Sequence, residues 1–141
     1  MDWTEEIKNM EGWHFGGKGS GLEDSLLDLV VSGIKTATCS WYESYAVEGE
    51  EIPSVGARSY IMNSKDEPVC VIEISSIEVI PFLQVGEDFA RAEGEGDRSY
   101  LYWKNEHERF FSEYGKTIGV AWNSKTQSVV CERFKVLHIF K

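Results

Sequence analysis

The sequence predicts an α+β fold, a small mixed β-barrel with helices packed at its ends. Segments that alternate apolar and polar residues, as half-buried strands do, outnumber the segments with helical periodicity. These strands do not alternate regularly with helices, which excludes the βαβ repeats of a parallel sheet. Two amphipathic segments, residues 22–32 and 97–115, are long enough for helices that cover a strand barrel.

The first predicted helix, over residues 22–32, leads directly into the first predicted strand. Its leucines and valines recur at helical spacing, and Gly33 fits the position just past a helix end. Residues 35–42, KTATCSWY, then alternate apolar and hydroxyl side chains, which is typical of a half-buried strand. A polar segment over residues 48–56 reads as a loop.

Three further strands and a short helix follow. Residues 58–63 form one strand, residues 69–80 form a long or bent strand, and residues 129–140 form the last strand. The segment PFLQVGEDFARAEGEGD, at residues 81–97, contains a short helix followed by a loop.

The second long helix has Asp97 as its expected N-cap and Gly115 as its expected end. One face of this helix is aromatic. It carries Tyr100, Trp103, His107, Phe110 and Tyr114. We interpret this face, His107 included, as core packing against the barrel.

Length and charge limit the classes of function. The 141 residues fit one domain, residues 1–141, and the formal net charge of −10 excludes duplex DNA as a partner. A small-molecule nucleoside or a short single-stranded RNA, held at a local site, remains possible. The oligomeric state stays undetermined.

The cysteines and the N-terminus predict the cellular location. Three separated cysteines show no metal-ligand spacing and read as reduced core residues. Because MDWTEE carries no apolar leader and no apolar run reaches membrane length, we expect a cytoplasmic protein without membrane contact.

Two segments match the first part of a ligand-binding motif but lack a required residue. GWHFGGKG lacks the Ser or Thr that a phosphate loop places after its lysine, and EGEGD lacks the turn glycine of a calcium loop. We therefore expect no metal and no cofactor.

Several motifs, in order, resemble the ASCH domain family, a branch of the PUA-like β-barrels. They are GIKTAT at residues 33–38, PSVG at 53–56, PF at 81–82, AEGEGD at 92–97 with Trp103 and His107 downstream, and VCERF at 130–134. The resemblance covers nearly the whole chain. It implies a PUA-like mixed barrel with a cleft beside the junction of the first helix and strand.

The resemblance also implies an activity. Some members of the family are amidohydrolases that remove the acetyl group of N(4)-acetylcytidine, and others have been described as ribonucleases. A Lys, a Thr and a Glu form the working set of the deacetylases, and they match Lys35, Thr38 and Glu93. By this analogy Thr38 is the nucleophile, Lys35 its base and Glu93 the acid that protonates the leaving amine. The candidate substrate-binding residues are Ser40, Trp41, Tyr45, Glu95, Asp97 and Arg98.

The chemistry sets two conditions on the structure. A free lysine, with a pKa of about 10.4, is almost wholly charged at neutral pH, so a base role requires desolvation or a proton shared with Glu93. Residues three apart on a regular strand point to opposite faces, so Lys35 must precede the strand, or a bulge must redirect it.

Three functions remain as alternatives. The favoured one is a small hydrolase acting on an acylated pyrimidine nucleoside. The second is an RNA-binding domain or ribonuclease using the same cleft. In this alternative Trp41 or Tyr45 stacks on a base, and the strand is held by Arg58, Arg98 or Lys104. The third is a ligand sensor or interaction domain without catalysis. Apart from these functions, Lys35 could have a purely structural role, because a lysine just after a helix end complements the helix dipole.

Overall fold

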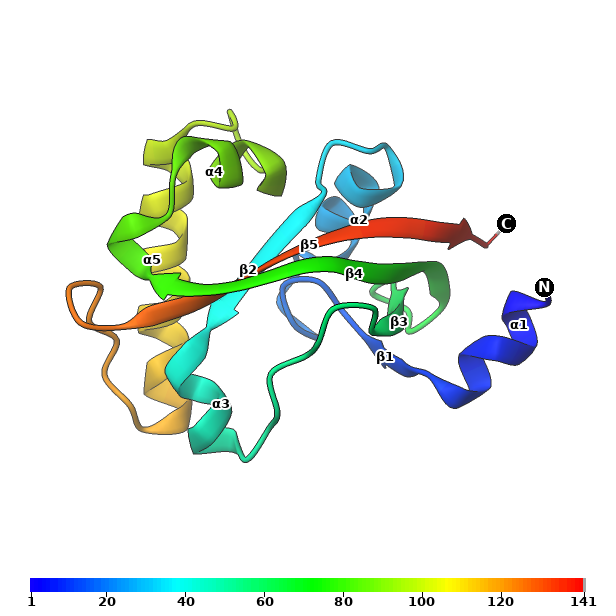
Figure 1. Ribbon diagram of the computed structural model, residues 1–141, viewed down its shortest axis with the longest axis horizontal. Coiled ribbons are helices and arrows are strands. Elements are labelled where there is room, and N and C mark those ends of the chain that lie inside the picture. Colours follow the sequence, from blue (N-terminus) through cyan, green and yellow to red (C-terminus); the bar gives the residue numbers. More distant parts are fainter. Residues whose placement is uncertain (141) are drawn as a thin grey trace.

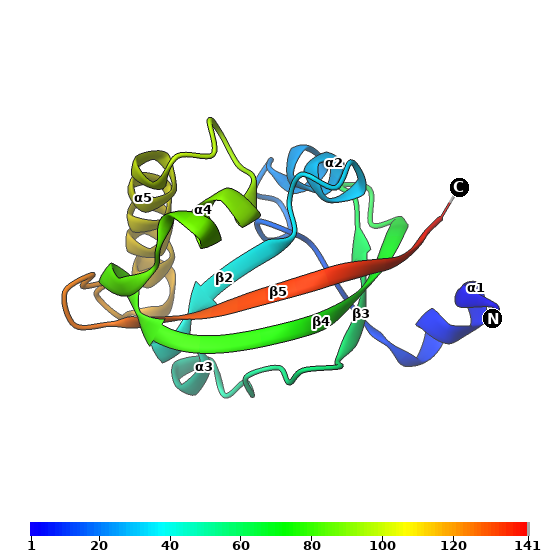
Figure 2. The ribbon, with the colours of Figure 1, turned by 45° about the horizontal axis from the view of Figure 1, so that its top comes forward.

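A computed structural model describes residues 1–140 and shows a curled five-stranded sheet with helices against it (Figure 1). The strand order is β1-β3-β4-β5-β2, with β1 parallel to β3 and the other pairs antiparallel. The sheet curls into an open half-barrel (Figure 2), which confirms the predicted α+β fold. The strands are β1 (Glu11–Trp13), β2 (Ala37–Trp41), β3 (Arg58–Met62), β4 (Pro68–Pro81) and β5 (Ser128–Ile139).

Two long strands give the sheet its curl. β4 and β5 run side by side along the whole sheet (Figure 2), and their pairing shifts between Val71 and Ile72 and again between Ile74 and Ser76. Such irregularities bend a strand and increase its local twist. The prediction of a long or bent strand over residues 69–80 is therefore confirmed.

The helices fall into two groups on the sheet. The helices are α1 (Trp3–Glu6), α2 (Glu23–Val31), α3 (Tyr42–Glu48), α4 (Glu87–Glu93) and α5 (Tyr100–Ile118), with short 3-10 turns η1 (Ile7–Asn9) and η2 (Phe82–Gln84). Figure 1 shows α4 and α5 at one end of the sheet and α2 beside the other half. None of the helices in residues 1–140 has the length and apolarity needed to cross a membrane.

Each group of helices covers its own core. The core beneath α4 and α5 contains Ala37, Trp41, Phe82, Val85, Phe89, Ala90, Trp103, Phe111, Val129 and Cys131. The core beneath α2 contains Phe15, Leu27, Val30, Ile61, Cys70, Ile72 and Phe134. β5 contributes side chains to both cores, Val129 and Cys131 to the first and Phe134 to the second, so it spans the region between them.

The long helix starts and ends later than the sequence predicted. Ser99, not Asp97, is its N-cap and accepts a hydrogen bond from the Tyr102 amide, while Asp97 accepts one from the Ser99 amide. Arg98 between them has a φ of 66°, a left-handed conformation that no helix can include. The helix also runs through Gly115 and ends at Gly119.

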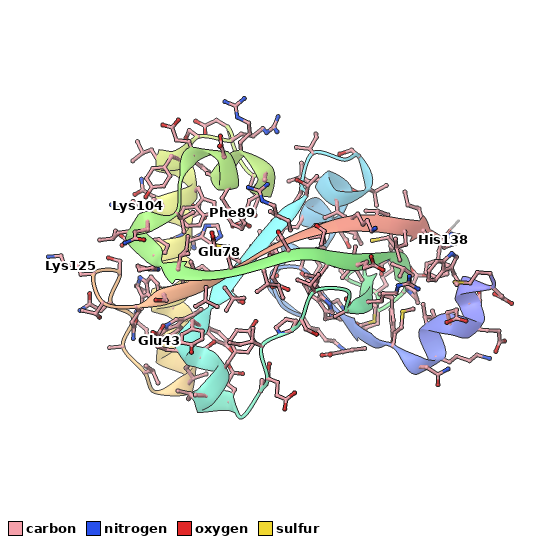
Figure 3. The ribbon with its side chains drawn as sticks, in the orientation of Figure 1. Glu43, Glu78, Phe89, Lys104, Lys125 and His138 are labelled. Atoms are coloured by element: carbon pink, nitrogen blue, oxygen red, sulfur yellow. The ribbon has the colours of Figure 1, made fainter. Side chains whose placement is uncertain are left out.

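Several short elements, among them α1, β1 and α3, were missed by sequence analysis. β1 is only three residues long, and α1 contains no buried residue. The indole of Trp3 stacks on His138, with ring centroids 6.0 Å apart, at the end of the sheet near the N-terminus (Figure 3). α3 begins directly after β2, at Tyr42, which the alternation pattern had placed in the strand.

We expect Gly115→Ala to lower the free energy of unfolding by about 1–3 kcal/mol through overpacking. A Cβ at this position would lie 2.2 Å from the Val120 carbonyl oxygen and 3.3 Å from the Trp41 ring. Helix propensity alone favours alanine over glycine by about 1 kcal/mol. A net loss of stability in Gly115→Ala would therefore come from the clash of the new Cβ with Val120 and Trp41. Urea unfolding provides the measurement, and the exposed Ser112→Ala in the same helix is the control.

Candidate functional site

Lys35 lies in the tight connection between α2 and β2. The left-handed Gly33, with a φ of 84°, turns the chain, and the Lys35 amide donates back to the Leu29 carbonyl at 3.0 Å. β2 begins only at Ala37, so Lys35 precedes the strand. This confirms the predicted irregular start. Because the period-two rule does not apply to Lys35, its side chain can share a cleft with Thr38.

The Lys35 ammonium is buried and fully hydrogen-bonded. Its residue is 2% exposed. Nζ donates to the Ala37 carbonyl at 2.9 Å, to Glu93 Oε1 at 3.0 Å and to Glu95 Oε2 at 2.8 Å. Burial lowers the pKa of Lys35, but the charges of Glu93 and Glu95 outweigh burial, and the net shift is upward. The resting lysine is therefore charged, which opposes the base role expected from the sequence.

Glu93 is brought to Lys35 by the end of α4. Gly94 follows it with a φ of 72°, and a Cβ there would lie 2.6 Å from the Ile34 carbonyl oxygen. The Thr36 amide donates to the Ala92 carbonyl at 2.7 Å. The close approach of these two backbones requires a glycine and places the Glu93 carboxylate beneath the connection that carries Lys35.

The second oxygen of Glu93 faces α5. Trp103 Nε1 donates to Oε2 at 2.6 Å, and His107 Nε2 lies 3.2 Å from the same oxygen. His107 Nδ1 is 2.7 Å from the Trp103 carbonyl, which can only accept, so Nδ1 carries a proton. Nε2 facing a carboxylate carries one too. The imidazole is therefore an imidazolium.

The pKa shifts of Glu93 and His107 agree with this assignment. Burial alone would raise the pKa of Glu93, but Lys35 and His107 lower it below its usual value. Burial alone would lower the pKa of His107, but the Glu93 charge raises it. Glu95 differs, because burial and the nearby Glu93 charge outweigh Lys35 and raise its pKa. Glu95 is thus the carboxyl of the cluster that protonates most readily.

These groups form the floor of a cleft between α2 and α5. Its polar lining includes Lys35, Thr38, Glu93, Glu95 and His107, and its volume is about 120 Å³. Apolar side chains from the glycine-rich loop and both helices form the walls, namely Phe15, Leu22, Leu26 and Phe110. The three residues predicted as catalytic, far apart in sequence, thus meet at one cleft.

Most of the predicted substrate-binding residues lie outside the cleft, and only Glu95 lines it. Trp41 as a stacking surface is wrong, because its side chain is 1% exposed and packs edge-on against Trp122 in the core. Ser40 and Tyr45 hydrogen-bond each other at 2.7 Å.

Asp97 and Arg98 belong to the start of α5 rather than to the cleft. Asp97 binds the Ser99 amide, and the Arg98 guanidinium is directed to the Arg91 carbonyl. Both residues are exposed. Both side chains therefore serve the turn that precedes the helix.

Sequence analysis missed the second role of His107. The ring stacks on Trp103 with centroids 4.5 Å apart, as the packing interpretation expects. It also pairs with Glu93 and lines the cleft. The four-residue spacing of Trp103 and His107, which places both on one helix face, was the available signal. No comparable signal marked Phe15 or Phe110.

One group of side chains could offer ligands to a cation. Cys39, Glu93 and His107 have ligand atoms that all lie within 4.8 Å of one another. Burial raises the pKa of the Cys39 thiol well above its usual value, and that of His107 is raised by Glu93. A cation would have to displace both protons and tolerate the adjacent Lys35 ammonium.

We expect Glu93→Gln to lower the free energy of unfolding by about 3–5 kcal/mol, because it breaks a buried ion pair from one side. Chemical denaturation at neutral pH measures the loss. Glu5→Gln, in an exposed pair with Lys8, is the matched control and should cost under about 1 kcal/mol. Equal losses in the two variants would contradict the interpretation of the buried pair.

We expect the pKa of His107 to lie above the ordinary value of about 6.5. The stability that its charge contributes is complete below the unfolded-state pKa and is lost as pH rises through the folded-state pKa. NMR titration of the imidazole measures the midpoint. In Glu93→Gln the His107 midpoint should fall, because burial still lowers the pKa of the imidazole while the Glu93 charge that raised it is gone. A wild-type midpoint below 6.5 would rule out the imidazolium.

Comparisons with known proteins agree with the fold. The family model of the ASCH domain matches residues 11–138. The ASCH domain from Lactobacillus crispatus JV V101 is 33% identical, with a TM-score of 0.83, over 96% of this chain and 84% of that chain. A protein from Enterococcus faecalis V583 is 32% identical, with a TM-score of 0.86, over 97% and 86%. No match was found among curated proteins. The chain belongs to the ASCH domain family.

Proposed function

We propose that the protein is a small hydrolase that acts on the amide of an acylated pyrimidine nucleoside, of the N(4)-acetylcytidine type. The observation that carries the proposal is the buried Lys35–Glu93 ion pair beneath a cleft that Thr38 also lines. Burying two charges costs several kcal/mol per ion, about as much as their attraction returns, so stability alone does not explain the pair. Such pairs, placed in a cleft, are characteristic of functional sites.

Thr38 is the nucleophile of the proposed reaction. It is the hydroxyl side chain among the residues that line the cleft. Attack of its Oγ1 on the acetyl carbonyl would give a tetrahedral intermediate with a negative oxygen. A nearby cation that needs no reorganisation stabilises such an oxygen.

Lys35 serves as that cation rather than as the base. The Lys35 proton that now bonds Glu95 is the one that can turn to the substrate. Glu95 is the partly exposed partner of Lys35, with 24% of its side chain accessible, so a substrate can replace it. Protonation of Glu95 would weaken its bond to Nζ, and the substrate carbonyl oxygen would take its place. The protonated Glu95 would then stand beside the scissile bond as the proton donor for the leaving amine, in place of Glu93.

RNA binding or cleavage in the same cleft is the runner-up, and it has less support. Besides Lys35 and His107, which both pair with Glu93, Arg109 is the basic residue that lines the cleft, and Glu106 pairs with it. The net charge of −10 opposes contact with an extended phosphate backbone. A cleft of about 120 Å³ also favours a small acyl amide over a polynucleotide.

We expect the wild-type protein to release cytidine and acetate from N(4)-acetylcytidine and Thr38→Ala to lose this turnover by at least about 10³-fold. Chromatography of the products gives the rates. Thr36→Ala is the control, since Thr36 is the neighbouring exposed threonine and does not line the cleft. Turnover retained in Thr38→Ala would refute the nucleophile, and cleavage of a short RNA instead of the nucleoside would favour the runner-up.

A further inference from the structure

Glu132 of β5 lies directly opposite Thr38 of β2. The two residues are Cα partners in an antiparallel pair whose register is unbroken from Ala37 to Trp41. The Phe134 amide donates to the Thr36 carbonyl at 3.1 Å, which makes Thr36 and Phe134 a hydrogen-bonded pair. Hydrogen-bonded and non-hydrogen-bonded pairs alternate along an antiparallel ladder, so Thr38 and Glu132, two positions away, are a hydrogen-bonded pair as well. Side chains of such a pair leave the sheet on the same face with Cβ atoms about 5 Å apart.

The Glu132 carboxylate has no hydrogen bond or ion pair with any residue in the described range 1–140, although Glu132 is half-buried. The titratable groups around it are Tyr45 from α3 and Glu93 from the end of α4. On β4 its partner is the apolar Ile77. Burial first, and the Glu93 charge second, raise the pKa of Glu132 to about 7. A carboxyl in this condition gains and loses a proton readily at neutral pH.

We propose that Glu132 is the general base that takes the hydroxyl proton of Thr38. The inference rests on the proposed function and supplies the group that it lacks. Glu132 is not among the residues that line the cleft, whereas Thr38 is. The base therefore stands behind the nucleophile, away from substrate. The two groups do not hydrogen-bond in this structure, and a rotation of the Glu132 side chain or one bridging water would connect them.

Of the other titratable groups near Thr38, Glu95 is already assigned as the proton donor and so starts protonated, and the remaining ones are less suited to the role. Lys35 has every ammonium proton accepted. Both oxygens of Glu93 are occupied, one by Lys35 and the other by Trp103. His107 carries protons on both ring nitrogens. None of these groups hydrogen-bonds the Thr38 hydroxyl, and none is free to accept its proton.

The steps balance with water as the only co-reactant. The Thr38 proton passes to Glu132 as Oγ1 bonds the acetyl carbon, and the C–N bond breaks as protonated Glu95 gives its proton to the amine. In the second half, a water molecule attacks the acetyl ester and gives a proton to Glu95. The C–O bond to Thr38 breaks, and Glu132 returns the first proton to Oγ1. Both carboxyl groups regain their starting states.

The test uses 4-nitrophenyl acetate, whose leaving group needs no proton, so it isolates the base from Glu95 and from nucleoside binding. We expect acetylation of Thr38 in the wild type, located by peptide mass spectrometry, with a rate about 10²-fold lower in Glu132→Gln. Glu78→Gln is the matched control and should leave the rate unchanged. Glu78 lies on β4 opposite Cys131 and next to Ile77, the partner of Glu132, so its side chain leaves the other face of the sheet.

The outcomes separate the two proposals. Equal acetylation rates in wild type and Glu132→Gln, or no adduct on Thr38 in the wild type, would overturn the role of Glu132. Normal acetylation that depends on Glu132, without hydrolysis of N(4)-acetylcytidine, would refute the proposed substrate and leave the base standing. Folding of the variant is not at risk, because Glu132→Gln removes a charge that has no partner.

Discussion

The ion pair between Lys35 and Glu93 is the contact on which the site depends. It joins the connection after α2 to the end of α4, and through Trp103 and His107 it joins both to α5. Each partner is nearly inaccessible to water, so each charge exists there only because the other does. Gly94 allows the end of α4 to approach the backbone at Ile34 closely. The Glu93 carboxylate then accepts hydrogen bonds from Lys35 and Trp103.

The pair also fixes the electrostatics of the cleft. Two cations, Lys35 and His107, surround one strongly ionised carboxylate, Glu93, which leaves the charge of Glu95 poorly compensated. The same negative Glu93 acts on Glu132 through the sheet. The acids of this region are thereby divided into Glu93, which stays ionised, and Glu95 and Glu132, whose pKa values are raised, first by burial and then by the Glu93 charge. This division is what acid–base chemistry requires.

Much of the fold follows from local patterns in the sequence. The period-two pattern located β2, β3, β4 and β5, and the requirement that Lys35 and Thr38 share a cleft correctly predicted an irregular start to β2. The start of α5 was missed by two residues because Asp97 and Ser99 are both good caps. The left-handed backbone of Arg98, which sequence does not reveal, decides between them.

The site was predictable only in part, for a different reason. Its three residues came from motifs, but their charge states come from contacts between α4, α5 and the α2–β2 connection, which no local pattern specifies. The alternation in KTATCSWY put Trp41 on the apolar face without saying that α5 would cover it. The role of Glu132 is harder still to predict from the sequence. Its position opposite Thr38 depends on the register between two strands about ninety residues apart, which only the structure gives.

β2 is the last strand of the sheet, and one side of its backbone has no neighbouring strand. The Ala37 carbonyl points to that open side, since it alternates with the Thr36 carbonyl that binds β5, and the Lys35 ammonium occupies it. An occupied carbonyl beside a buried positive charge is a poor template for an added strand. Lys35 thereby also protects the edge strand β2 from pairing with a strand of another molecule, which is a route to aggregation.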